Sequence, residues 1–171
     1  MQQDHKDKIS SASGHLGIAE KQYPNAILIP EIVKMMDEGH TVTIILKGFS
    51  MRPFLENNRD KALMKKAVSP QKGDPVLAEI KPQMYVLHRI IDINGDKVVL
   101  RGDGNLGTEQ CQIKDIKGTV IGFYRKGRTI LDRTDGWKWK TYSLVWTHLY
   151  PIRRWLLAFY RRIWIPLFGV I

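Results

Sequence analysis

The sequence has 171 residues, which is enough for one domain of ordinary size with an appended segment. Its 43% hydrophobic and 26% charged residues are typical of a globular protein and exclude simple disorder, collagen and a polytopic membrane protein. The formal net charge of +10 indicates an acidic partner, such as nucleic acid or anionic lipid.

Residues 1–25 are mostly polar and show no apolar periodicity, so we expect a flexible N-terminal arm. Their apolar runs are far shorter than the core of about 7 to 15 residues in a signal peptide, and no export signal is predicted. Pro30 then predicts the start of a helix, and Gly39 predicts its end.

Short apolar segments follow this helix, and turn residues such as Gly73 with Asp74 separate them. Their spacing predicts six strands, at residues 41–47, 61–67, 75–80, 84–93, 97–101 and 118–125. With the leading helix, these strands predict a compact, mainly β domain over residues 26–135.

Asn94-Gly95 lies between two apolar runs and is a strong signal for a hairpin. If these two residues form the loop, His88 faces Arg101 across the hairpin. Since side chains two residues apart share a face of a strand, His88 and Asp103 then become diagonal neighbours at about 7 to 8 Å. The register therefore predicts an imidazole and a carboxylate within reach of each other.

Ser50 lies in the sequence Gly48-Phe49-Ser50-Met51-Arg52-Pro53, directly after a predicted strand. The proline ends that strand, so the serine is presented on a turn. A serine hydroxyl becomes a nucleophile when a neighbouring base accepts its proton, and backbone N–H groups of a tight turn can stabilise an oxyanion. Taken alone, a Gly-x-Ser motif is more often ordinary turn chemistry than a nucleophile.

Four further motifs follow the Ser50 turn: Lys72-Gly73-Asp74-Pro75-Val76, His88-Arg89-Ile90-Ile91, Arg101-Gly102-Asp103-Gly104-Asn105 and Gly118-Thr119-Val120-Ile121-Gly122. In this order and spacing, the chain from about Val42 to Arg125 resembles the signal peptidase and LexA-like serine peptidases. The motif that begins with His88-Arg89 resembles the histidine subtype of this family, which is found in the endoplasmic reticulum and in archaea.

The resemblance implies a serine endopeptidase in which Ser50 is the nucleophile, His88 the general base and Asp103 the acid that orients the imidazole. The hairpin register independently favours the contact between His88 and Asp103. A Ser-Lys dyad is the alternative, and it would need Lys81 or Lys97 to reach the serine.

The chain departs from the family pattern at three places. Glu109 stands where the family often has a second acid, usually Asp. Gly48 stands where some members have a serine in the oxyanion hole, so backbone N–H groups near Gly48, Phe49 and Met51 are expected to line the oxyanion and substrate site. Familiar signal peptidases have a membrane span before the nucleophile, and residues 1–47 contain none.

Residues 136–171 differ sharply from the rest, with no acidic residue, six basic residues and all five tryptophans. Two prolines bracket a predicted helix over residues 151–165. At about 100° per residue, its apolar side chains gather on one side and its arginines on the other: Ile152, Trp155, Leu156, Phe159, Tyr160, Ile163 and Trp164 against Arg153, Arg154, Arg161 and Arg162. This pattern favours attachment to an anionic membrane surface, and packing on the β domain is the alternative.

The sequence therefore favours a serine endopeptidase that cleaves signal-peptide-like or propeptide-like polypeptides and is either peripherally membrane-associated or cytoplasmic. The alternative is a non-catalytic β module that binds a membrane or a protein partner through its tail. The histidines and Cys111 lack metal-ligand spacing, so neither metal nor cofactor is predicted. Nucleic acid is not expected as a partner, and the oligomeric state stays open.

Overall fold

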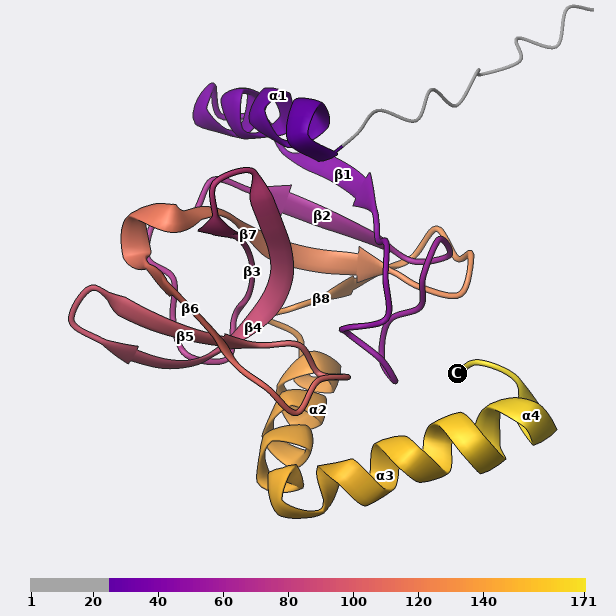
Figure 1. Ribbon diagram of the computed structural model, residues 1–171. Helices are drawn as coiled ribbons and strands as arrows, with labels where there is room; N and C mark the ends of the chain where they lie inside the picture. The colour runs from indigo at the N-terminus through magenta and orange to yellow at the C-terminus, as the bar shows by residue number, and fades with distance from the viewer. Residues whose placement is uncertain (1–24) are drawn as a thin grey trace, which may run out of the picture.

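The structure is a computed structural model, and it describes residues 25–171 (Figure 1). The expected arm at residues 1–25 lies outside the described residues except for its last position. The described chain is mainly β, with a leading helix and a C-terminal helical segment, which confirms the predicted fold class.

Eight strands form one antiparallel sheet: β1 (Val42–Ile45), β2 (Lys61–Lys65), β3 (Pro75–Lys81), β4 (Met84–Asn94), β5 (Lys97–Arg101), β6 (Glu109–Gln112), β7 (Ile116–Tyr124) and β8 (Leu131–Arg133). Their order is β1-β2-β7-β3-β4-β5-β6, and β8 pairs with β7. All six predicted strands are present. β6 and β8 were not predicted, because they have four and three residues and contain no apolar run.

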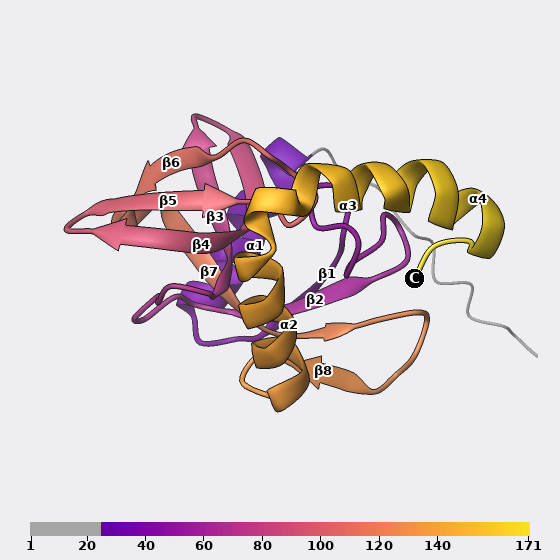
Figure 2. The same cartoon turned by 90° about the horizontal axis from the view of Figure 1, so that it is seen from below.

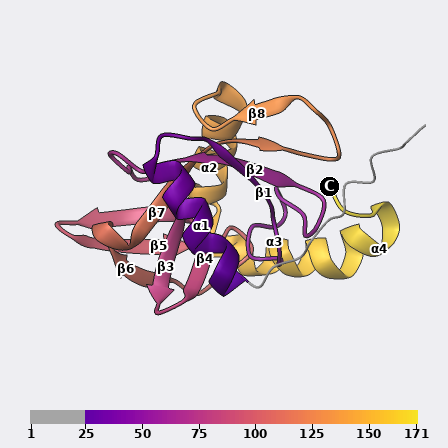
Figure 3. The same cartoon turned by 90° about the horizontal axis from the view of Figure 1, so that it is seen from above.

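The leading helix, α1 (Asn25–Asp37), lies across one side of the sheet (Figure 3). It was expected to begin at Pro30, and that expectation is wrong because the proline lies inside the helix. Ile29 and Met36, on either side of Pro30, are 5% and 0% exposed. Burial of the Ile29 side chain ahead of the proline, worth about 1.5 to 3 kcal/mol, offsets the backbone hydrogen bond that proline cannot donate.

The C-terminal segment begins with α2 (Trp137–His148), which was not predicted (Figure 2). Trp139 on this helix is 4% exposed and belongs to the main apolar core, where its ring lies 5.0 Å from the ring centres of both Phe54 and Phe123. The change of composition near residue 136 therefore marks the start of a core helix. It does not mark the edge of the packed unit.

A turn at Tyr150–Ile152 leads into α3 (Arg153–Phe159), a π-helical turn (Tyr160–Trp164) and α4 (Ile165–Phe168), which together form one extended arm in yellow in Figure 1. Three buried side chains dock this arm: Arg153, Leu157 and Tyr160. Arg153 was expected on a solvent face, but its Nη2 donates to the carbonyl of Trp146 at 2.6 Å.

Other apolar side chains of the arm are exposed. Four of its side chains are 47% to 73% exposed: Trp155, Phe159, Ile163 and Phe168. The helix therefore packs on the domain through one side, as the alternative expected, and attachment of its exposed apolar side chains to a membrane stays a prediction. Within residues 25–171, no helix has the length and hydropathy needed to cross a membrane.

Candidate active site

Ser50 lies in the turn that follows β1 and that Gly48 opens with a φ of +91°. The N–H of Gly48 donates to Asn57 Oδ1 at 2.8 Å, and the N–H of Arg52 donates to the carbonyl of Phe49 at 3.2 Å. The positive φ explains the glycine, because other residues rarely adopt this conformation. The serine is partly buried.

The Gly102-Asp103-Gly104 loop after β5 packs directly on the Ser50 turn. The N–H of Gly104 donates to the Ser50 carbonyl at 2.7 Å. A Cβ at Gly102 would clash with that carbonyl and would lie 3.0 Å from Nε2 of His88. The absence of a side chain at Gly102 therefore lets the serine turn and the imidazole approach the same point.

His88 on β4 is 3% exposed, and its Nδ1 donates to Glu109 Oε2 at 3.0 Å. This bond places the proton of a neutral imidazole on Nδ1 and leaves Nε2, on the side of Gly102, able to accept a proton. Burial lowers the pKa of His88, and the nearby carboxylate of Glu109 only partly opposes this effect. The imidazole is thus held in the neutral form that a general base requires.

The structure brings the backbone of the Ser50 turn and His88 Nε2 together on one side of Gly102, but among the described residues no hydrogen bond joins the Ser50 hydroxyl to the imidazole. The backbone N–H groups of Ser50 and Met51 also find no protein acceptor within residues 25–171. These two groups are therefore candidates for binding an oxyanion.

The three residues expected to line the oxyanion and substrate site differ in what they offer. The N–H of Gly48 is occupied by Asn57, so it is not a free donor. The side chain of Met51 is 6% exposed and belongs to the core, which leaves only its N–H for the site. Phe49 is 51% exposed and can contact a bound chain.

Asp103 does not orient the imidazole as expected. Its carboxylate accepts hydrogen bonds from Arg89 Nε at 3.0 Å, Arg89 Nη2 at 2.7 Å and the Tyr142 hydroxyl at 3.0 Å. Arg89 also donates to the Ser143 hydroxyl. The carboxylate that contacts His88 is Glu109, which the sequence had suggested only as a second acid.

A shift of the hairpin register by one residue explains this exchange of acids. Asn94 pairs with Lys97, so the loop is Gly95-Asp96, and an irregularity between Ile90 and Asp92 then places Arg89 opposite Arg101. Because a slip of one residue turns each side chain to the other face, Arg89 and not His88 shares a face with Asp103.

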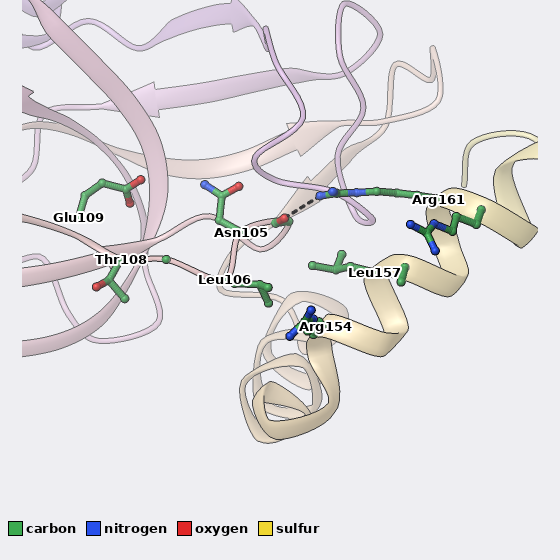
Figure 4. A pocket seen from close by; sticks show the side chains of 11 residues that line it. Asn105, Leu106, Thr108, Glu109, Arg154, Leu157 and Arg161 are labelled. Atoms are coloured by element: carbon green, nitrogen blue, oxygen red, sulfur yellow. Dashed lines mark hydrogen bonds between the residues drawn. The ribbon is translucent and has the colours of Figure 1, made fainter.

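A cleft of about 580 Å³ opens between the loop after β5 and α3 (Figure 4). Glu109 and Asn105 line one side, while Arg154, Leu157 and Arg161 line the other. Arg161 Nη2 donates to the carbonyl of Gly104 at 3.0 Å, which links the arm to the loop that borders the Ser50 turn. The cleft is therefore cationic on its helical side and reaches the acid that holds His88.

Sequence reasoning missed the contribution of α2 to the site. Tyr142 donates to the Asp103 carboxylate, and Trp146 Nε1 donates to the Asp103 carbonyl at 3.0 Å. These partners lie 39 and 43 residues from Asp103 in the chain, so no local signal indicates them. In the part of the chain that the structure describes, no cluster of three His, Cys, Asp or Glu side chains could hold a metal ion.

A search against models of known protein families gave no match. A search of curated proteins gave no significant match either.

Proposed function

We propose that the chain is a serine endopeptidase with Ser50 as nucleophile, His88 as general base and Glu109 as the acid that holds the base. One observation supports this best: the buried imidazole is fixed by Glu109 at Nδ1, and its Nε2 lies against the loop that packs on the Ser50 turn. These contacts run from a carboxylate to an imidazole and on to a serine turn, which are the components of a nucleophilic triad.

In the proposed reaction, Ser50 Oγ attacks the carbonyl carbon of the peptide bond while its proton passes to His88 Nε2. The N–H groups of Ser50 and Met51 donate to the oxyanion, and Glu109 stabilises the imidazolium. The imidazolium gives its proton to the leaving amine, which breaks the C–N bond and forms an acyl-enzyme. Water, deprotonated by the same imidazole, then releases the acid product and restores Ser50.

The proposed substrate is an extended polypeptide. β1 leads into the Ser50 turn and pairs only with β2 among the described strands, so its other edge offers backbone groups to an added strand. The exposed ring of Phe49 lies at the end of this path. Signal-peptide-like and propeptide-like substrates are implied by the resemblance of the motifs.

The test is active-site labelling with a fluorophosphonate, followed by mass spectrometry of the labelled peptide. We expect labelling at Ser50 in the parent and in the control Ser69→Ala, whose serine is exposed in a distant loop. Ser50→Ala should lose the label, and His88→Ala should strongly reduce it. Cleavage of secretory precursors by Ser50→Ala at the parental rate would contradict the proposal.

We also propose that the arm formed by α3 and α4 binds an anionic membrane surface. The exposed apolar side chains of this arm include Trp155 at 73% and Phe159 at 51%, and Arg154 and Arg162 beside them are exposed as well. Aromatic side chains next to arginines match the interface between lipid tails and anionic headgroups. This surface also supports the second candidate function, a non-catalytic module that docks on a membrane.

Vesicle co-sedimentation tests the arm without disturbing the core. The double variant Trp155→Ser/Phe159→Ser should bind phosphatidylglycerol vesicles at least about tenfold more weakly, because two large apolar side chains no longer enter the interface. The control Val68→Ser changes a side chain that is 84% exposed in a loop outside the arm. Equal binding by the double variant and the parent would remove the membrane proposal.

A further inference from the structure

A second cavity, of about 240 Å³, lies beside the start of α3 and apart from the cleft at Glu109. Four cationic side chains line it, from four different parts of the chain: Lys72, Arg89, Arg101 and Arg153. Lys72 is exposed at the rim, while Arg89 and Arg153 are 3% and 4% exposed. The cavity therefore has a mouth open to solvent and a floor of buried guanidinium groups.

The positive charge of this cavity is not balanced within the described chain. Asp103 is the only acidic residue that lines it, and both of its carboxylate oxygens already accept hydrogen bonds from Arg89. Among residues 25–171, neither Arg101 nor Arg153 forms an ion pair. Burial lowers the pKa of Arg153; the Asp103 carboxylate opposes this effect only in part, and repulsion by Arg101 and Arg89 adds to it.

Two hydrogen-bond donors of residues that line this cavity are buried and unused. Nε of Arg101 and Nε of Arg153 have no acceptor in the described structure. An unsatisfied buried donor costs about 1 to 3 kcal/mol, and more when it is charged, so native proteins rarely leave such groups without a partner. Two such donors on residues that line one cavity indicate a missing acceptor.

Aromatic rings hold both guanidinium groups in place. Arg101 lies over the ring of Tyr150 at 3.8 Å, and Arg153 lies over Trp146 at 5.1 Å. Arg153 Nη2 is further fixed by its bond to the carbonyl of Trp146. Stacking uses the faces of the guanidinium groups and leaves their edges, which carry the N–H donors, free for a ligand.

We propose that this cavity is a binding site for a phosphate group, held by Arg101, Arg153 and Lys72. A phosphate group carries up to two negative charges and several acceptor oxygens, so it can bond donors that converge from different elements, whereas a carboxylate has only two oxygens in one plane. The same chemistry is offered by inorganic phosphate and by the phosphate of a lipid headgroup. The site does not depend on peptidase activity.

Phosphate binding would also link the arm to the sheet, because Arg153 lies on α3, Arg101 on β5 and Lys72 in the loop before β3. In the absence of a ligand, repulsion among these cations opposes docking of the arm. A bound dianion would reverse that interaction. We therefore expect phosphate to raise the stability of the folded chain.

The experiment is a titration of the purified full chain with inorganic phosphate at constant ionic strength, followed by calorimetry and by thermal unfolding. We expect saturable binding at one site and a rise in Tm that chloride does not reproduce. Arg101→Gln should weaken binding at least about tenfold, because a charge-assisted partner is lost, and Lys72→Gln should weaken it to a smaller extent. Lys72 is exposed, so its variant keeps the test informative if Arg101→Gln does not fold.

Arg154→Gln is the matched control, since Arg154 is next to Arg153 in the chain and lines the other cleft. It should bind phosphate as the parent does. Absence of saturable binding by the parent, or parental affinity in both Arg101→Gln and Lys72→Gln, would overturn the proposal.

Phosphatidylglycerol vesicles distinguish the two sources of phosphate. Weaker vesicle binding by Arg101→Gln than by the parent would support a lipid headgroup as the ligand. Loss of inorganic phosphate binding in Arg101→Gln with unchanged vesicle binding would support a soluble phosphate at the same site.

Discussion

Asp103→Asn would leave the guanidinium of Arg89 as a buried cation without its carboxylate. The two side chains lie at the centre of the contact between β4, the loop after β5 and α2, and the residues are 3% and 1% exposed. An asparagine keeps the shape of the acid but replaces one oxygen by an amide group. Since Arg89 and Tyr142 both donate to Asp103, that amide would have to face a donor.

The size of the effect follows from this burial. Removing one partner of a buried ion pair destabilises a protein by about 3 to 5 kcal/mol. For a chain of this length, 1 kcal/mol corresponds to about 2 to 4 °C in Tm. We therefore expect Asp103→Asn to lower Tm by about 6 to 20 °C.

Urea unfolding measures the loss in free energy of unfolding. Tryptophan fluorescence reports the transition, because Trp139 and Trp146 are buried against the sheet and the Asp103 loop. Glu109→Gln is the control. The carboxylate of Glu109 is 28% exposed and faces an imidazole that is neutral near pH 7, so we expect a loss below about 1 kcal/mol. If the two variants unfold at the same urea concentration, Asp103 does not have the structural role that its contacts indicate.

Two further predictions concern the imidazole and the loop beside it. Because the pKa of His88 is lowered, turnover with His88 as base should rise with pH in one step below about pH 6.5. The folded chain should lose stability as the pH falls through that lowered pKa, because the unfolded chain then binds the proton more readily. Glu109→Gln should lower the pKa of His88 further, which NMR titration of the ring would show, and an unchanged pKa would contradict the pairing. Gly102→Ala should displace the Ser50 turn and reduce fluorophosphonate labelling at Ser50 at least about tenfold, because the new methyl group overlaps the Ser50 carbonyl. The control Gly107→Ala should have little effect on labelling, because a Cβ at Gly107 meets nothing within 4 Å.

The features that follow from local sequence patterns were the ones that the sequence predicted well. Six strands were found from alternating apolar residues and turn signals, and the turn around Ser50 was found from a glycine and a proline at the end of a strand. These signals act over a few residues, so a single sequence contains them completely.

The features that depend on distant residues could not be obtained in the same way. The irregularity between Ile90 and Asp92 changes the hairpin register, and with it the partner of the imidazole, although nothing in the local sequence indicates it. Burial of Arg153 depends on the carbonyl of Trp146, at the end of another helix. Helical periodicity separates apolar from charged side chains, but it does not show which side meets the sheet.

The contacts of α2 predict that removal of residues 137–171 would unfold the domain and would not simply detach a membrane anchor. Truncation after Gly136 removes Trp139 from the main core and takes both α2 partners away from Asp103. Truncation after His148 keeps these contacts and removes only the arm. We therefore expect the longer fragment to retain cooperative unfolding and to lose vesicle binding, while the shorter one should show no cooperative transition in circular dichroism. A folded and stable 1–136 fragment would show that α2 is an accessory to the sheet, and would make the Asp103 contacts with α2 dispensable for the site.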